Sequence, residues 1–327
     1  MKKVLTIYVL CLMAAPVMAM DVETATPVAP PVECKNLTDR EKRLQCYDSQ
    51  SLVEAESLTG TVLDDRIRLQ YALEENSYSL DAHYPSYILP FSYMSSPNES
   101  PYSPSYGSTP LNEDLKNMEV KFQISFRLPL NRDFFVRGSH LWFAYTQLSL
   151  WQLYNRDGSS PYRESNYEPE LVWAFLVNKS IGDAKLTHVA IALNHQSNGQ
   201  PEPLSRSWNR VYINGILAYN NWVFNLRPWY RLPENQSDDD NPDIEDYMGN
   251  FDIRVGYKQH DHQFSSLFRS TFDQDNPRSY YELGYSFSIH RKYRGYVQFV
   301  NGYGESLIDY NHRNKRVSLG IMLNDWF

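Results

Sequence analysis

The chain lacks the features of a nucleic-acid-binding protein or a helical membrane protein. Its 31 lysines and arginines are outnumbered by 39 aspartates and glutamates, and the net charge of -8 argues against a nucleic-acid partner. After the N-terminal segment, no stretch approaches the roughly 20 apolar residues that a transmembrane helix needs. Cysteine is scarce, with three residues in 327, so at most one disulfide can form.

The first 19 residues have the pattern of a secretory signal peptide. Two lysines precede an apolar run from Val4 to about Ala15, and small residues at Val17 and Ala19 lie before a cleavage point. An exported bacterial protein without a transmembrane helix is expected to be either soluble in the periplasm or a membrane barrel.

Residues 20–85 differ in character from the rest of the chain. They open on the proline-rich stretch TATPVAPPVE, which predicts a flexible or polyproline-like linker. Removing residues 1–19 also removes Cys11, so Cys34 and Cys46 remain as a pair in an oxidising compartment, and we expect a disulfide between them. This segment is interpreted as an N-terminal periplasmic extension.

Residues 86–327 contain twelve candidate strands in which apolar and polar residues alternate. A period of two sends successive side chains to opposite faces of a strand, as expected where one face meets lipid and the other a polar lumen. The clearest apolar series is Val120, Phe122, Ile124, Phe126, Leu128 and Leu130. The pattern predicts an all-β fold, a 12-stranded antiparallel transmembrane β-barrel.

Composition also favours a barrel in the outer membrane. Hydrophobic residues make up 42% of the chain although its mean hydropathy is -0.55, and 25 tyrosines and 7 tryptophans suit aromatic girdles. The last strand ends on Phe327, a terminal aromatic residue that resembles the assembly signal of outer-membrane barrels. A soluble β-sandwich is the less favoured alternative.

An even number of strands places both ends of the barrel on the periplasmic side. Odd-to-even connections then lie outside the cell, and most are longer and polar. They include residues 97–117, 153–166, 198–206, 233–247 and 304–312, whereas turns near 179–184, 218–221 and 259–262 are short.

One predicted hairpin carries candidate catalytic residues at the outer rim. Strand parity places His195 and Ser197 on the face of Ile191 and Leu193, and a hairpin centred on Glu202 sets His195 opposite Asn209. Nucleophilic acyl transfer needs a serine, an imidazole that takes its proton and a third group that orients the ring. Asn209 is uncharged, so positive or dipolar stabilisation of the oxyanion is expected from a metal or from backbone N–H groups near Gly199.

Other readings remain open from the residues alone. Polar side chains collect where strands meet headgroups, so His195 and Ser197 could be structural. A passive pore or adhesin would use the lumen or the acidic loop QSDDDNPDIEDY, although Arg127, Arg227, Arg254 and Glu282 can fill a narrow lumen with ion pairs. An outer-membrane protease would require carboxylates at the rim.

Several motifs resemble the outer-membrane phospholipase A family of calcium-dependent barrel hydrolases. The resemblance extends over most of residues 118–327, and NHQSNG followed by SRSWNR at this spacing is its most specific part. The matching stretches are YTQLSLWQL, SSPYRESNYEPE, NHQSNG, SRSWNR, NPDIEDYMG, GYGESLIDYN and LNDWF.

The resemblance implies a role for each site residue. Ser197 would be the nucleophile, His195 the general base and acid, Asn209 the orienting residue, and Gly199 an oxyanion-hole donor. The Ca²⁺ ligands would be the carbonyls of Gln200 and Ser205 and the side chain of Ser159 from a second subunit, with Glu202 at a site that the family uses in the monomer. Gln200 and Glu202 stand where the family commonly has Arg and Asp.

The resemblance also implies a homodimer, with Gln147 at its interface. Gln147 shares the parity of Phe143 and Tyr145 and faces lipid, where an unpaired amide is costly, and a Gln147–Gln147 hydrogen bond would satisfy both groups. An amide at headgroup depth is the alternative. The implied activity is phospholipase A1, phospholipase A2 and lysophospholipase hydrolysis at the extracellular leaflet of a bacterial outer membrane, activated by dimerisation.

Overall fold

The computed structural model of this chain describes residues 38–41, 63, 80–111, 114–290 and 293–324. The predicted signal peptide, Cys34, Cys46 and the terminal Phe327 lie outside the described residues. The chain divides into two units, Met1–Leu58 and Thr59–Phe327, and all the strands belong to the second.

Twelve strands form the barrel wall, as the alternating pattern predicted. They are β2 (Ser86–Met94), β5 (Met118–Arg132), β6 (Ser139–Trp151), β7 (Tyr162–Ile181), β8 (Ala184–Ser197), β9 (Ser207–Tyr219), β10 (Trp222–Arg231), β11 (Phe251–Gln259), β12 (His262–Ser270), β13 (Ser279–His290), β14 (Tyr293–Tyr303) and β15 (Arg313–Asn324).

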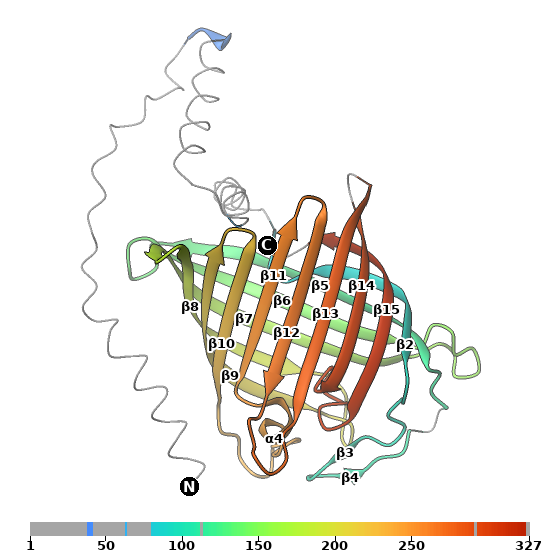
Figure 1. The fold of residues 1–327 in the computed structure, drawn as a ribbon. Coiled ribbons are helices and arrows are strands. Elements are labelled where there is room, and N and C mark those ends of the chain that lie inside the picture. Colours follow the sequence, from blue (N-terminus) through green and yellow to red (C-terminus); the bar gives the residue numbers. More distant parts are fainter. Residues whose placement is uncertain (1–37, 42–62, 64–79, 112–113, 291–292, 325–327) are drawn as a thin grey trace. The chain divides into compact units, whose positions relative to one another are not determined.

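These strands close into an antiparallel barrel (Figure 1). Each strand pairs with its neighbours in the chain, except that β2 pairs with both β5 and the last strand, β15. The ring is complete because β5 also pairs with β6. Closure leaves no sheet edge unpaired, which a sheet inside a bilayer requires.

Connections at one end of the barrel are long, and we call this the long-loop end. It carries residues 95–117, 152–161, 198–206, 232–250, 271–278 and 304–312. Within these loops lie the short pair β3 (Tyr102–Ser103) and β4 (Gly107–Ser108) and the helix α4 (Glu245–Met248). Within the described part of the chain, no helix is both long and apolar enough to cross a membrane.

Side chains alternate across the barrel wall as expected for a lipid-facing exterior and a polar interior. On β5, Ile124 and Leu130 are about half exposed on the outside, while Lys121 and Ser125 are buried. On β15 the outward Val317 and Leu319 behave in the same way.

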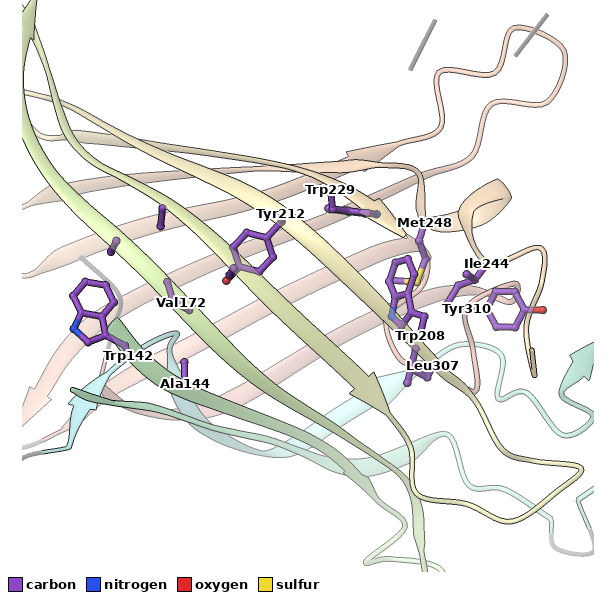
Figure 2. Packing of buried hydrophobic residues seen from close by; sticks show 13 residues of the cluster. Trp142, Ala144, Val172, Trp208, Tyr212, Trp229, Ile244, Met248, Leu307 and Tyr310 are labelled. Carbon is purple, nitrogen blue, oxygen red and sulfur yellow. The ribbon is translucent and has the colours of Figure 1, made fainter. Parts of the chain in front are cut away.

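An apolar cluster fills part of the interior and continues into the loops (Figure 2). Trp142 and Tyr212 point inward from the wall, whereas Met248 and Leu307 come from the long-loop end. The loops therefore pack against the interior of the barrel and do not simply extend into solvent.

A network of buried charges holds strands together near the long-loop end. Arg316 lies 2.7 Å from oxygens of both Glu119 and Glu305, and Glu305 is also 3.0 Å from the Lys121 ammonium. Burial alone would raise the pKa of Glu305, but Arg316 and Lys121 outweigh it and hold the pKa at about 2. The carboxylate is therefore ionised at neutral pH.

Ion pairs occupy the lumen, as we predicted from the four charged residues Arg127, Arg227, Arg254 and Glu282. Arg227 and Arg254 both lie near Asp252, at 2.6 and 3.7 Å. Arg127 pairs with Asp81, and Glu282 lies 4.0 Å from the Lys121 ammonium.

A short segment before β2 enters the barrel. The two-residue strand β1 (Asp81–Ala82) pairs with β5, and the next residue, His83, contacts the buried Glu170 of β7 at 2.7 Å. Residues 81–83, which the sequence placed in the extension, therefore contact the barrel strands β5 and β7 directly.

We predict that replacing Arg316 by Ala destabilises the barrel by about 3–5 kcal/mol, because two buried carboxylates lose a shared partner. Urea unfolding in detergent measures the change. The control is Lys315→Ala, which alters an exposed cation on the adjacent position of β15 and should change stability by less than about 0.5 kcal/mol. Equal losses in the two variants would contradict a structural role for the buried network.

Candidate active site

The β8–β9 hairpin sets His195 opposite Asn209, as the sequence predicted. Ser197, at the end of β8, is opposite Ser207 at the start of β9. Residues 198–206 connect the two strands at the long-loop end, so the candidate catalytic residues lie at that rim of the barrel.

The site lies on the outer surface of the wall. Ile191 and Leu193 are 44% and 52% exposed on the outward face of β8, and His195 and Ser197 follow on the same face, partly buried. Asn209 continues the corresponding face of β9. A polar site thus adjoins an apolar stripe, which suits a substrate that lies in a lipid layer.

Asn209 orients the imidazole through a hydrogen bond. The Oδ1 atom of Asn209 lies 2.9 Å from Nδ1 of His195. Because an amide oxygen only accepts, the ring must donate from Nδ1, and this tautomer leaves Nε2 as the basic nitrogen. The basic nitrogen of the ring, Nε2, is therefore the one that does not contact Asn209.

Ser197 lies one same-face step beyond His195 along β8. Within the described part of the chain, no hydrogen bond joins the Ser197 hydroxyl to the imidazole. Contacts between a nucleophile and its base often shorten only in a substrate complex. The structure thus brings His195 and Asn209 together and places Ser197 beside them.

Asn209 has a second partner that sequence reasoning missed. Its Nδ2 donates to Oε1 of Glu234 at 3.0 Å. Glu234 lies in the 232–250 loop, 25 residues away, and burial raises the pKa of its carboxyl. No periodicity or motif links the two positions.

The loop after Ser197 is held in a tight conformation. Gly199 has φ +63°, which favours glycine, and a Cβ there would come within 3.2 Å of the Tyr167 ring. The side chain of Asn198 organises the rest of the loop, because its Oδ1 accepts from the Arg206 N–H at 2.9 Å and its Nδ2 donates to the Leu204 carbonyl at 2.9 Å.

Three of the four predicted metal-ligand residues share this loop. Gln200, Glu202 and Ser205 lie between β8 and β9, whereas Ser159 lies in the 152–161 loop with φ +60°. Carbonyl and hydroxyl oxygens are hard ligands of the kind that calcium takes. Within the described residues no group of three His, Cys, Asp or Glu side chains is placed to hold a metal ion. The residues offer oxygen donors of the class that calcium takes, and in this structure the Ser205 carbonyl accepts a hydrogen bond from the Arg206 guanidinium at 2.6 Å.

Asp240 ties three loops of the long-loop end together. Its carboxylate accepts from the Ser205 hydroxyl at 2.6 Å and from the Tyr106 hydroxyl at 2.7 Å. The hydrogen bond to Asp240 raises the pKa of Tyr106. Although it belongs to an acidic run, Asp240 is buried, and its neighbour Asp239 pairs with Arg231 at 2.7 Å.

Gln147 has partners within its own chain. Its Oε1 accepts from the Tyr145 hydroxyl at 3.2 Å, and its Nε2 donates to Ser149 at 3.1 Å. The amide on the outer face is therefore satisfied, at least once on each atom, before any second subunit is considered.

Comparison with known proteins gives consistent matches. Residues 63–323 match the family model described as phospholipase A1. Phospholipase A1 of Proteus vulgaris is 39% identical over 256 residues, which cover 77% of this chain and 84% of the relative. Phospholipase A1 of Escherichia coli strain K12 is 42% identical over 215 residues, covering 66% and 73%.

Two solved structures of outer membrane phospholipases are similar to this chain in both fold and sequence. Outer membrane phospholipase A from Escherichia coli has a TM-score of 0.69 and 37% identity, covering 77% of this chain and 95% of that chain. The outer membrane phospholipase of Salmonella typhi, described as a dimer with bound calcium, has a TM-score of 0.69 and 36% identity, covering 77% and 94%.

We predict that Asp240→Ala loosens the loops around the site, because the hydroxyls of Tyr106 and Ser205 lose a charged acceptor. Amide hydrogen exchange in residues 103–106 and 204–206 should accelerate at least about tenfold, as measured by mass spectrometry. Asp238→Ala removes an exposed carboxylate from the same loop and serves as the control. Unchanged exchange in the Asp240 variant would show that other contacts hold the loops.

Proposed function

Since the chain belongs to the phospholipase A1 family of outer-membrane enzymes, we propose that it cleaves acyl esters of glycerophospholipids with Ser197, His195 and Asn209 as its catalytic triad. The observation that carries the assignment of the residues is the 2.9 Å contact between His195 and Asn209 on the lipid-facing wall, one step from Ser197.

The reaction follows from the tautomer that Asn209 selects. Nε2 of His195 takes the proton of Ser197 as the serine oxygen attacks the ester carbonyl carbon, and the carbonyl oxygen becomes an oxyanion. The tetrahedral intermediate then expels the lysophospholipid alkoxide, which takes the proton back from Nε2. Water, deprotonated by the same nitrogen, hydrolyses the acyl-serine and releases a fatty acid.

The oxyanion needs a source of stabilisation other than Asn209. The backbone N–H of Gly199, two residues after the nucleophile, is the proposed donor, and the positive φ at this position together with the Tyr167 ring keeps the turn specific for glycine. Any side chain at position 199 would disturb the turn that carries this donor.

Calcium is the proposed cofactor. Its ligands would be the carbonyls of Gln200 and Ser205 and the hydroxyl of Ser159 of the partner subunit, and when bound it would supply positive charge beside the oxyanion. The relative from Salmonella typhi, described as a dimer with bound calcium, supports this assignment. Glu202 is a further proposed ligand, since it lies in the 198–206 loop with Gln200 and Ser205 and carries a carboxylate, an oxygen ligand that calcium takes.

We place the site at the extracellular leaflet, because strand parity puts the long-loop end outside. The outer leaflet normally contains lipopolysaccharide and little phospholipid, so substrate would reach the site when the asymmetry of the membrane fails. Phospholipase A2 and lysophospholipase activities are proposed as well. The site lies on the outer surface of the wall at the rim, where it would admit either acyl ester of a phospholipid or the single ester of a lysophospholipid.

A passive pore or adhesin is the alternative, and the lumen argues against conduction. Arg127, Arg227 and Arg254 are engaged in ion pairs with carboxylates on the same or neighbouring strands, and Arg227 and Arg254 line an interior cavity of about 120 Å³.

Ser197→Ala should lower fatty-acid release from phosphatidylethanolamine in mixed micelles by at least about 10³-fold, because the nucleophile is lost. Release by the wild type should require calcium and stop with a chelator. Ser207→Ala is the matched control, since Ser207 is the residue opposite Ser197 on β9. Equal release by wild type and Ser197→Ala would reject Ser197 as the nucleophile, and no release from either together with ion conductance would favour the pore.

Activity should rise with the fraction of dimer, because Ser159 of the partner subunit would complete the calcium site. Gln147→Leu should lower both the dimer fraction, measured by crosslinking, and the specific activity. Phe264→Leu is the control, because Phe264 is outward-facing on β12, opposite β6 in the ring. Crosslinked dimers no more active than dilute monomer would refute the dependence on dimerisation.

A further inference from the structure

Asn209 can orient His195 only if its amide is held the right way round. Rotation of the amide by 180° would present the NH₂ group to Nδ1, and the ring would then have to carry its proton on Nε2. In that tautomer Nε2 could not take a proton from Ser197. A triad with asparagine in third place therefore needs a second contact that distinguishes the amide oxygen from the amide nitrogen.

Glu234 makes such a contact. An ionised carboxylate only accepts hydrogen bonds, so Oε1 of Glu234, 3.0 Å from Nδ2 of Asn209, allows the amide nitrogen on its side and disfavours the oxygen. The flipped amide would bring two oxygens together and would also lose its acceptor contact to the imidazole.

The carboxylate is held in place by its own loop. The Leu232 N–H donates to the Asn209 carbonyl at 2.8 Å, which fixes the start of the loop against β9. Arg231 lies 3.9 Å from the second carboxylate oxygen and is itself anchored to Asp239 at 2.7 Å. The Glu234 side chain is only 15% exposed. It is thus part of a packed arrangement and is not a surface side chain in a chance contact.

We propose that Glu234 is a positioning residue of the active site, which fixes the amide of Asn209 so that His195 keeps its proton on Nδ1. The proposal rests on the proposed function, because it acts through the triad. It also places a negative charge two hydrogen bonds from the imidazole, in a triad whose third member has none. The other charged groups that face this carboxylate are Arg231, Asp239 and Asp240.

Three variants of the full-length protein separate this role from a structural one. Glu234→Ala removes the acceptor, and kcat for fatty-acid release from phosphatidylethanolamine micelles with calcium should fall about tenfold or more, with KM unchanged, because part of the population holds the wrong tautomer. Glu234→Gln keeps the size of the side chain, but its amide can present either an oxygen or an NH₂ group to Asn209, so its kcat should lie between those of the wild type and Glu234→Ala, whereas a purely structural role would leave it at the wild-type value. Asp238→Asn, in the same loop, is the control and should be unaffected.

The decisive comparison is between Glu234→Ala made in the wild type and Glu234→Ala made in the Asn209→Ala variant. In Asn209→Ala, the further change Glu234→Ala should have no additional effect on kcat, because the residue through which Glu234 acts is already gone. Wild-type kcat in Glu234→Ala, or the same loss of kcat with and without Asn209, would overturn the proposal. Loss of release in Ser197→Ala combined with full activity in Glu234→Ala would reject this inference alone, whereas full release by Ser197→Ala would reject the proposed function itself.

Discussion

Every backbone N–H and C=O group inside a bilayer needs a partner, and the structure of this chain follows from how its sheet meets that constraint. Twelve strands close on themselves through the β5–β6 pairing, so that no edge is left. Closure fixes register, and register fixes which side chains face lipid. A slip of one residue between β8 and β9 would separate His195 from Asn209 and turn one of them into the lumen. The relative positions of the site residues are therefore set by the hydrogen-bond register of β8 and β9.

The long-loop end adds a second level of order. Loops distant in sequence meet there through side-chain hydrogen bonds, with Asp240 joining Tyr106 to Ser205. Below them, Met248 and Leu307 pack on the apolar cluster inside the barrel (Figure 2). Loops anchored in this way can hold ligand oxygens and a carboxylate such as Glu234 in fixed positions beside a wall that is itself rigid.

The wall could be predicted from the sequence, whereas the contacts between loops could not. Period-two alternation indicates a strand from local sequence alone. Once the centre of the β8–β9 hairpin was located, the pairing of His195 with Asn209 followed directly. Glu234 reaches Asn209 across a different loop, and nothing in the spacing of two polar residues 25 positions apart signals a hydrogen bond. The burial of Asp240 could not be predicted for the same reason, since burial of a carboxylate depends on which loops cover it. The entry of His83 into the barrel is likewise a contact between distant segments, because its partner Glu170 lies 87 residues away.

The hydrogen bond between Asn209 and Glu234 also restricts what the third position of the triad can be. Aspartate, the residue that many serine hydrolases use there, would set two carboxylates about 3 Å apart in a partly buried place, where both cannot remain ionised. One would take up a proton, and the pair would share it instead of serving the imidazole. Positions 209 and 234 consequently form a single chemical unit: an amide at one is compatible with a carboxylate at the other, and a change in either alters the demand on its partner.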